Sequence, residues 1–270
     1  MIKHINRIKK NYGNKALITG ASAGIGKSFA YILASYGFDL VITARRIERL
    51  NSIKAELEKD FNVSVTCIEA NLSDKSGIRN IVELMKIYNP GILVSNAGFG
   101  NLGPLSGNDV SLIENMIKVN CLSASLLINT FAGIERDSKR KAIINISSVM
   151  AKLPLSFASL YAATKGFNSA FGEALYHELK QESIDILTVL PGSTSTEFNG
   201  FGNNIPGSKQ RKPEQVVTTS LKALGKKPVV VDGFGNRLNV LLSRIVPTSS
   251  RIYFTGKVAG WQYKKVKNQL

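Results

Sequence analysis

Cysteine is scarce in this sequence, and its scarcity excludes two kinds of protein. The two cysteines among 270 residues, Cys67 and Cys121, are far apart in the chain. A small secreted domain stapled by disulfides needs more of them, so the pair indicates reduced side chains in a cytoplasmic protein. Since the cysteines do not cluster, we also expect no metal site.

Acidic residues are few as well. The sequence has 19 of them against 35 lysines and arginines, which gives a formal net charge of +16. From Ile205 to Leu270 the only acids are Glu214 and Asp232, against thirteen cations. Nucleic acid, anionic lipid and acidic proteins all attract such a charge. No zinc-finger spacing, helix-turn-helix or aromatic RNP-type strand accompanies it, so we do not expect a nucleic-acid partner.

Long hydrophobic runs are also missing. No stretch is apolar over the length that a bilayer requires, and residues 1–14 lack the apolar block of a signal peptide. The length and the balanced apolar content favour one domain with a sizeable core. We therefore expect a cytoplasmic protein with a basic N-terminal segment at 1–14, a main domain at 15–232 and a basic amphipathic extension at 233–270.

From Lys15 onward, patterns typical of strands alternate with patterns typical of helices. We expect strands at 15–19, 39–43, 64–68, 92–94, 142–146 and 185–190, and helices from Ile25 and at 47–59, 75–87, 110–131 and 159–181. Such alternation requires a parallel sheet with helices on both faces and ligands at the carboxyl ends of the strands. The predicted fold class is α/β, a single-domain, Rossmann-like doubly wound parallel sheet with a C-terminal helical extension. The loop at 192–212 is too long for a plain connection, so we expect it to be a substrate lid.

Three glycines lie between the first strand and the first helix of this pattern. Gly20 can turn the chain sharply, and Gly24 and Gly26 lack the Cβ atoms that would keep phosphates away from the helix N-terminus. The stretch therefore predicts a pyrophosphate site. It also fits the G-x-S-x-G nucleophile elbow of α/β hydrolases, but the only histidine after Ser22 is His177, which lies inside a long helical pattern. A plain tight turn is the remaining alternative.

Tyr161 and Lys165 are four residues apart in one helical pattern, so their side chains share a face. A nearby ammonium favours the phenolate, and we expect it to lower the pKa of Tyr161 below its usual value of about 10. Ser148 follows a strand at the edge where ligands bind and can donate a hydrogen bond to a carbonyl oxygen. Together the three residues predict hydride addition to a carbonyl carbon while Tyr161 protonates the oxygen. Each alone is more often a surface or capping residue.

In register, these motifs resemble the short-chain dehydrogenase and reductase family in its NADP-preferring form. The resemblance covers 15–231 and rests on Thr19-Gly20-Ala21-Ser22-Ala23-Gly24-Ile25-Gly26, Asn96-Ala97-Gly98, Asn120, Ser148, Tyr161 with Lys165, and Pro191-Gly192 with Thr196. There are two departures. Asn71 precedes Leu72 where the family usually has Asp, and Ser95 stands where the family often has Asn.

The resemblance implies a role for each matching residue. The catalytic residues would be Asn120, Ser148, Tyr161 and Lys165, where Asn120 would hold a water that relays protons to Lys165. Lys165 would also hold the nicotinamide ribose, and Asn71 would hydrogen-bond near the adenine. The cofactor-binding residues would be Gly20, Ser22, Ala23, Gly24, Ile25, Gly26, Arg45, Asn71, Leu72, Asn96, Ala97, Gly98, Tyr161, Lys165, Pro191, Gly192, Thr194 and Thr196.

The end of the second strand predicts which cofactor is bound. A carboxylate there would bind the ribose hydroxyls of NAD and repel a 2′-phosphate, but Asp39 lies at the other end of this strand. The strand instead runs into Arg45 and Arg46. An arginine suits a phosphate, and Arg45 is nearer the strand end, so we expect it to bind the 2′-phosphate of NADP(H). Alternatively, both arginines only begin a charged surface helix.

These observations predict an oxidoreductase that transfers hydride from NADPH to the carbonyl of an apolar small molecule. A 3-oxoacyl chain, a sterol-like ketone and another ketone or aldehyde all fit. The alternative is a catalytically silent nucleotide-binding regulator or scaffold of the same fold. Loss of Asn120, Ser148, Tyr161 or Lys165 would have favoured that alternative, and all four are present.

The C-terminal extension carries an apolar stripe and a basic, aromatic end, and each predicts a contact with another surface. Leu238, Leu241, Leu242, Ile245 and Val246 form one helical stripe, which we expect to pack against the sheet or a second subunit. We expect a homo-oligomer, a dimer or tetramer. The stretch 256–270 mixes aromatic residues with lysines and has no acid, which suits the headgroup region of an anionic membrane. We therefore expect a peripheral contact with the cytoplasmic face of a membrane.

Overall fold

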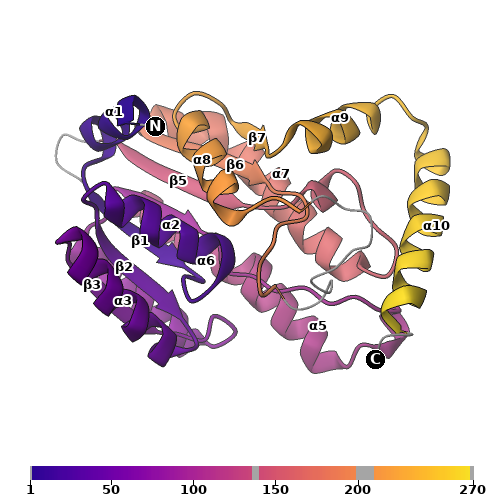
Figure 1. Cartoon of the computed structure of the whole chain (residues 1–270), viewed down its shortest axis with the longest axis horizontal. Coiled ribbons are helices and arrows are strands. Elements are labelled where there is room, and N and C mark those ends of the chain that lie inside the picture. The colour runs from indigo at the N-terminus through magenta and orange to yellow at the C-terminus, as the bar shows by residue number, and fades with distance from the viewer. Residues whose placement is uncertain (1, 136–139, 199–209, 268–270) are drawn as a thin grey trace.

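The structure, a computed structural model, describes residues 2–135, 140–198 and 210–267. Within them a parallel sheet has the strand order β3-β2-β1-β4-β5-β6-β7 (Figure 1). The strands are β1 (Lys15–Thr19), β2 (Asp39–Ala44), β3 (Val65–Glu69), β4 (Ile92–Ser95), β5 (Lys141–Ile146), β6 (Ile184–Leu190) and β7 (Val229–Val231). Because the order runs outward from β1 in both directions, the doubly wound α/β fold is confirmed. Six strands match their predicted bounds to within one residue, whereas the three residues of β7 are too few to show a pattern.

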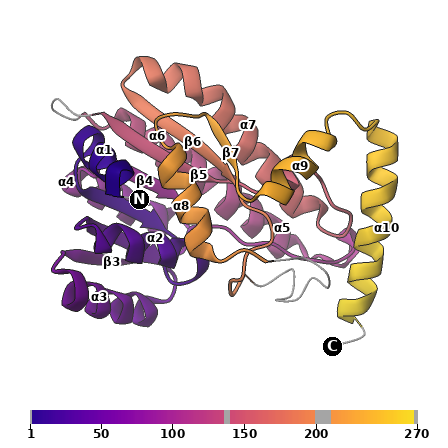
Figure 2. The same ribbon diagram turned by 45° about the horizontal axis from the view of Figure 1, so that its top comes forward.

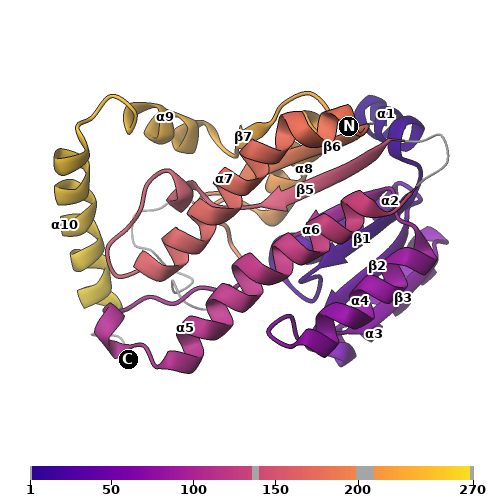
Figure 3. The ribbon, with the colours of Figure 1, turned by 180° about the vertical axis from the view of Figure 1, so that it is seen from behind.

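Helices cover both faces of the sheet (Figures 1 and 3). One face carries α2 (Gly24–Ser35), α3 (Ile47–Phe61) and α8 (Pro213–Ala223), and the other carries α4 (Lys75–Tyr88), α6 (Ser123–Gly133) and α7 (Ser159–Gln181). Successive strand residues point to opposite faces. Ile18 of β1 therefore joins the core with α2 and α3, while Leu17 joins the core with α4 and α6.

The basic N-terminal segment contains α1 (Ile2–Tyr12), a helix that the sequence patterns do not predict. Ile5, Ile8 and Tyr12 are buried in the same core as α2 and α8. The Tyr12 hydroxyl donates to Asp185 Oδ2 at 2.7 Å, and Arg140 donates to both oxygens of the same carboxylate at 3.1 and 3.0 Å. Asp185 lies near the start of β6, so α1 closes the amino end of the sheet, away from the edge where ligands bind.

The long helix predicted over 110–131 is interrupted. α5 (Val110–Ile117) leads into a π-helical turn, η2 (Lys118–Leu122), before α6 begins. The run Val110–Gly133 is long and apolar enough to cross a membrane by length and composition alone, contrary to our expectation that no such run exists. It packs against α4, α7 and β4 and contains the buried Asn120, so its contacts are those of a helix that covers the sheet.

Two helices, α9 (Phe234–Leu242) and α10 (Thr248–Lys267), form the predicted C-terminal helical extension at the end of the molecule remote from α3 (Figure 2). The prediction that the apolar stripe from Leu238 to Val246 packs against the sheet is wrong. Its five side chains are between 38% and 75% exposed, and Val240 is the buried residue of α9. The chain turns away from the sheet because α10 packs elsewhere: Ala259 is buried, and Tyr263 stacks on Phe157 with the ring centroids 4.8 Å apart.

Candidate active site

A cavity of about 430 Å³ runs along the carboxyl ends of β1 to β6. This is the edge where the sequence predicts a ligand. The predicted residues on its wall are Gly20, Ser22, Ala23, Gly24, Ile25, Arg45, Asn71, Leu72, Asn96, Ala97, Gly98, Ser148, Tyr161, Lys165, Pro191, Gly192, Thr194 and Thr196. Gly26 and Asn120 are not on the wall. Within the described residues, no group of three His, Cys, Asp or Glu side chains is placed to hold a metal ion.

The turn after β1 fits the phosphates of a dinucleotide. Gly20 has a φ of +68°, and a Cβ on Gly26 would lie 2.3 Å from the carbonyl oxygen of Gly20, so both positions need glycine. α2 begins at Gly24 on the cavity wall, and no side chain caps its first N–H groups. These groups can therefore donate hydrogen bonds to an anion in the cavity. Asn96 Nδ2 donates to the Thr19 carbonyl at 2.9 Å and ties the turn to the end of β4.

Ser148, Tyr161 and Lys165 meet at the other end of the cavity. Ser148 lies shortly after β5 and directly before η3 (Val149–Ala151). Tyr161 and Lys165 lie on successive turns of α7. The Ser148 hydroxyl hydrogen-bonds the Tyr161 phenol. The Lys165 ammonium donates to the Ile146 carbonyl at 3.0 Å and lies 5.8 Å from the centroid of the Tyr161 ring. The structure therefore brings the three predicted side chains together.

Burial controls the ionisation of this group. Tyr161 is 8% exposed and Lys165 is 3% exposed. Burial raises the pKa of Tyr161 to about 12, against the opposing effect of the Ser148 hydrogen bond, and burial lowers the pKa of Lys165 to about 8. The expectation that the ammonium lowers the pKa of the phenol is wrong, because burial outweighs it and the ammonium is directed at the Ile146 carbonyl. Tyr161 therefore keeps its proton at neutral pH, as a proton donor must.

Asn120 lies behind the cavity wall and organises the chain there. Its Nδ2 donates to the Phe99 carbonyl at 2.8 Å and to Thr164 Oγ1 at 2.9 Å, and its Oδ1 accepts from the Phe99 N–H at 3.0 Å. Both hydrogens of the amide are used, so the side chain has none left to donate to a water. The water relay to Lys165 stays a prediction, whereas the positioning of Phe99 follows from these contacts.

Comparison with known proteins shows to which family this chain belongs. The family described as short chain dehydrogenase matches residues 14–204. The chain belongs to the short-chain dehydrogenase family. The relatives that it resembles are oxidoreductases, and similar structures contain a nicotinamide cofactor, so an oxidoreductase with such a cofactor is supported.

The names of individual relatives of this short-chain dehydrogenase refer to 3-oxoacyl-CoA and hydroxysteroid compounds. Very-long-chain 3-oxoacyl-CoA reductase of Bos taurus is 29% identical over 217 residues, 79% of this chain and 69% of that protein. 7beta-hydroxysteroid dehydrogenase of Clostridium sardiniense is 26% identical over 255 residues, 93% of this chain and 97% of that protein. A short-chain dehydrogenase from Sphingobium yanoikuyae, in complex with NADPH, is 28% identical with a TM-score of 0.76 and covers 86% of this chain and 93% of that one. Other similar structures contain NADP or NAD.

Arg46, the second of the two arginines that follow β2 in this dehydrogenase, lies beside a carboxylate that sequence reasoning missed. Arg45 and Arg46 both line the cavity. Arg46 Nη2 donates to Ser22 Oγ at 3.2 Å, and Arg46 Nη1 lies 3.5 Å from Glu197 Oε2, which Arg49 Nη1 approaches to 2.5 Å. The hydrogen bond from Arg49 lowers the pKa of Glu197. These pairs are exposed and weak, so an anionic ligand can compete with Glu197 for the arginines. No local pattern could find Glu197, because only the fold carries the loop after β6 to the end of β2.

Asn71 and Leu72 both line the cavity, but the side chain of Asn71 is used locally. Its Nδ2 donates to Asp74 Oδ2 at 2.9 Å, and its Oδ1 accepts from the N–H and the hydroxyl of Ser73 at 3.2 and 3.0 Å. These bonds shape the turn into α4. They use one of the two Nδ2 hydrogens, so the hydrogen bond from Asn71 near an adenine stays a prediction.

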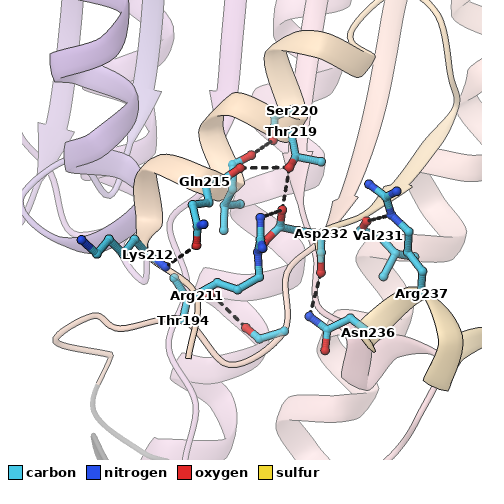
Figure 4. A network of polar contacts seen from close by, with 12 residues as sticks. Thr194, Arg211, Lys212, Gln215, Thr219, Ser220, Val231, Asp232, Asn236 and Arg237 are labelled. Carbon is cyan, nitrogen blue, oxygen red and sulfur yellow. Dashed lines mark hydrogen bonds and ion pairs between the residues drawn. The ribbon is translucent and has the colours of Figure 1, made fainter. Parts of the chain in front are cut away.

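A partly buried ion pair, formed on the carboxylate of Asp232, fixes the base of the loop after β6 (Figure 4). Asp232 is fully buried just beyond β7 and accepts from Arg211 Nε at 2.5 Å, from Arg211 Nη2 at 3.1 Å and from Thr219 Oγ1 at 2.6 Å. The main chain of Arg211 in turn pairs with the loop: its N–H donates to the Ser193 carbonyl at 3.0 Å, and its carbonyl accepts from the Ser195 N–H at 2.9 Å. Both ends of the loop are thereby joined to β7 and α8.

The predicted lid at 192–212 is described only at its two ends, and 199–209 lie outside the described residues. The first end crosses the cavity. Thr196 Cγ2 would lie 3.0 Å from a Cβ on Gly24, and the Phe198 ring is 5.6 Å from the Tyr161 ring, centroid to centroid. The sequence does carry a signal for the anchor, because Asp232 is one of two acids in a strongly basic region.

Substitution of Arg211 tests whether this anchor supports the cofactor site. Arg211→Gln leaves the buried carboxylate of Asp232 without its cation, so we expect the free energy of unfolding to fall by about 3 kcal/mol. Cofactor affinity should weaken several-fold, because the limb from Gly192 to Thr196 loses its support. Lys212→Gln removes the adjacent, exposed cation and is the matched control. Chemical denaturation and cofactor titration that give the same values for both variants would contradict the anchoring role.

Proposed function

We propose that this dehydrogenase reduces the carbonyl group of an apolar small molecule, with NADPH as the hydride donor and Tyr161 as the proton donor. The observation that carries the proposal is the meeting of Ser148, Tyr161 and Lys165 on the wall of a cavity that continues to the glycine turn. A dinucleotide whose pyrophosphate lies at that turn can extend along the same cavity toward the three side chains.

The chain's own residues divide the reduction between them. NADPH supplies the hydride to the carbonyl carbon. The Ser148 hydroxyl donates a hydrogen bond to the carbonyl oxygen, and Tyr161, whose burial keeps it protonated at neutral pH, transfers its proton to that oxygen. The Lys165 ammonium behind the ring then stabilises the phenolate until a proton returns.

The catalytic end of the cavity is suited to an apolar substrate. Phe99, Val149, Met150 and Phe198 line it near Ser148. Similarity to a very-long-chain 3-oxoacyl-CoA reductase and to a 7beta-hydroxysteroid dehydrogenase supports the same choice. We therefore infer a 3-oxoacyl chain, a sterol-like ketone or another bulky ketone or aldehyde as the substrate class.

The preference for NADP(H) rests on the end of β2. Arg45 and Arg46 line the cavity there, while Asp39 lies at the opposite end of the strand. Arg45 directly follows the last residue of β2, and we assign it to the 2′-phosphate.

The assembly and the location of the enzyme belong to the same proposal. Exposed apolar side chains on α5 and α7, among them Val110, Ile117 and Phe167, support a homo-oligomer, either a dimer or a tetramer. The two free cysteines support a cytoplasmic location.

Tyr161→Phe tests the role of the phenol. We expect kcat for ketone reduction to fall by about 10²- to 10⁴-fold, because the proton donor is lost, while the Kd for NADPH stays nearly unchanged, because the ring still packs. Tyr176→Phe, at a half-buried tyrosine of the same helix that does not line the cavity, is the control and should keep wild-type kcat. NADPH absorbance with a panel of ketones of graded size measures both variants and ranks the substrates. If Tyr161→Phe kept most of its activity, the proton would come from another group.

Arg45→Ala tests the cofactor preference. Loss of a charge-assisted contact with the 2′-phosphate should raise the Kd for NADPH by about tenfold or more and leave the Kd for NADH unchanged. Arg79→Ala removes an exposed arginine from α4 and serves as the control. Fluorescence titration of both cofactors gives the four constants, and equal affinity of the wild type for NADPH and NADH would overturn the preference.

A further inference from the structure

Among the described residues, the exposed large apolar side chains are concentrated on α9, on α10 and in the turn between them. Of the nineteen large apolar residues exposed among the described ones, eleven lie between Phe234 and Trp261. Scattered single residues of this kind are normal on a soluble protein, but a concentration on two adjacent helices marks a docking surface. Both helices lie at one end of the molecule, beyond β7 (Figures 1 and 2).

The outward face of α10 has a defined pattern. Phe254, Val258 and Trp261 follow one another at i, i+4 and i+7, so they lie along one side of the helix, and each is more than half exposed. Lys257 and Lys264 are exposed beside this row. The pattern is an aromatic and aliphatic row flanked by lysines.

Contacts with the body of the protein hold α10 in this orientation. On the opposite side of the helix, Ala259 is 1% exposed and Tyr263 stacks on Phe157 at an interplanar angle of 4°. Arg251 Nη1 donates to the Ser243 carbonyl at 3.0 Å and ties the start of α10 to the end of α9. Because one side of α10 is already packed, the row formed by Phe254, Val258 and Trp261 is presented outward.

Charge decides which partner fits this surface. Residues 233–270 contain seven lysines and arginines and no aspartate or glutamate. In a two-fold contact between identical surfaces, cations would face cations without a carboxylate to pair with them, which opposes self-association. A bilayer with anionic headgroups offers the complementary charge, and its interfacial region accepts Trp, Tyr and Phe.

We propose that α9 and α10 form a docking surface for an anionic lipid bilayer. The row of Phe254, Val258 and Trp261 enters the interfacial region, the exposed stripe of α9 adds apolar area, and Lys257 and Lys264 contact the headgroups. Apolar and basic signals reinforce each other, since neither alone binds a membrane stably. This inference does not depend on the proposed reaction, because none of these residues lines the cavity.

Co-sedimentation of the full chain with vesicles tests the proposal. Vesicles of phosphatidylcholine with phosphatidylglycerol should pellet the protein at low salt, vesicles of phosphatidylcholine alone should not, and high salt should release it. Lys257→Gln with Lys264→Gln should lower the partition coefficient by about 30-fold, or about fivefold for each lysine. Lys75→Gln with Lys86→Gln changes the net charge equally on α4, at the other end of the molecule, and should bind as the wild type does.

A second variant separates the lipid surface from a subunit interface. Phe254→Ser with Trp261→Ser should also reduce pelleting, while sedimentation velocity without vesicles should show an unchanged oligomeric state. Reductase activity on a soluble ketone reports that both variants fold. If the wild type stays in the supernatant with anionic vesicles, the membrane proposal is wrong. If the serine variant dissociates an oligomer, the surface binds another copy of the chain, and the proposal is again wrong.

Discussion

The proposed reaction depends on an ammonium group and a phenol that are held together out of water. Lys165 donates to the Ile146 carbonyl from one turn beyond Tyr161, and burial moves their pKa values in opposite directions, the lysine down to about 8 and the tyrosine up to about 12. Both shifts have one cause, because burial disfavours the charged form of each group. The result at neutral pH is a phenol that holds its proton beside a cation that can stabilise the phenolate.

The sheet explains why these groups lie in the same cavity as the predicted cofactor-binding residues. In a parallel sheet the turns that follow the strands gather at one edge, so the glycine turn after β1, Ser148 after β5 and the loop after β6 line one cavity. The loop is the least regular of these parts, and it depends on a buried anchor: Asp232 and Arg211 join both ends of the loop to β7 and α8. A regular sheet thus supplies the positions, and the ion pair of Arg211 with the buried Asp232 supports the loop.

Features carried by local patterns were predictable from the sequence, and features created by distant packing were not. Strand alternation, the glycine turn and the Tyr161–Lys165 spacing are local, and the structure places each as expected. Glu197 beside Arg46 and the stacking of Tyr263 on Phe157 each join residues far apart in the chain, so no short motif could reveal them. The pKa of Tyr161 was predicted in the wrong direction for the same reason: the spacing shows the neighbouring cation, but only the fold shows how much water is excluded.

The most direct test of this account is the pH dependence of kcat/KM for ketone reduction with NADPH. Lys165 is an ammonium below its pKa of about 8 and neutral above it, whereas Tyr161 keeps its proton throughout this range. The account therefore predicts a constant kcat/KM through neutral pH and a fall as the pH rises through about 8. In Lys165→Arg the side chain stays charged, so kcat/KM should not fall as the pH rises through about 8, whatever the rate of the variant. A wild-type profile that stays flat up to about pH 10, near the usual pKa of lysine, or that falls equally in Lys165→Arg would contradict the central role of the buried ammonium.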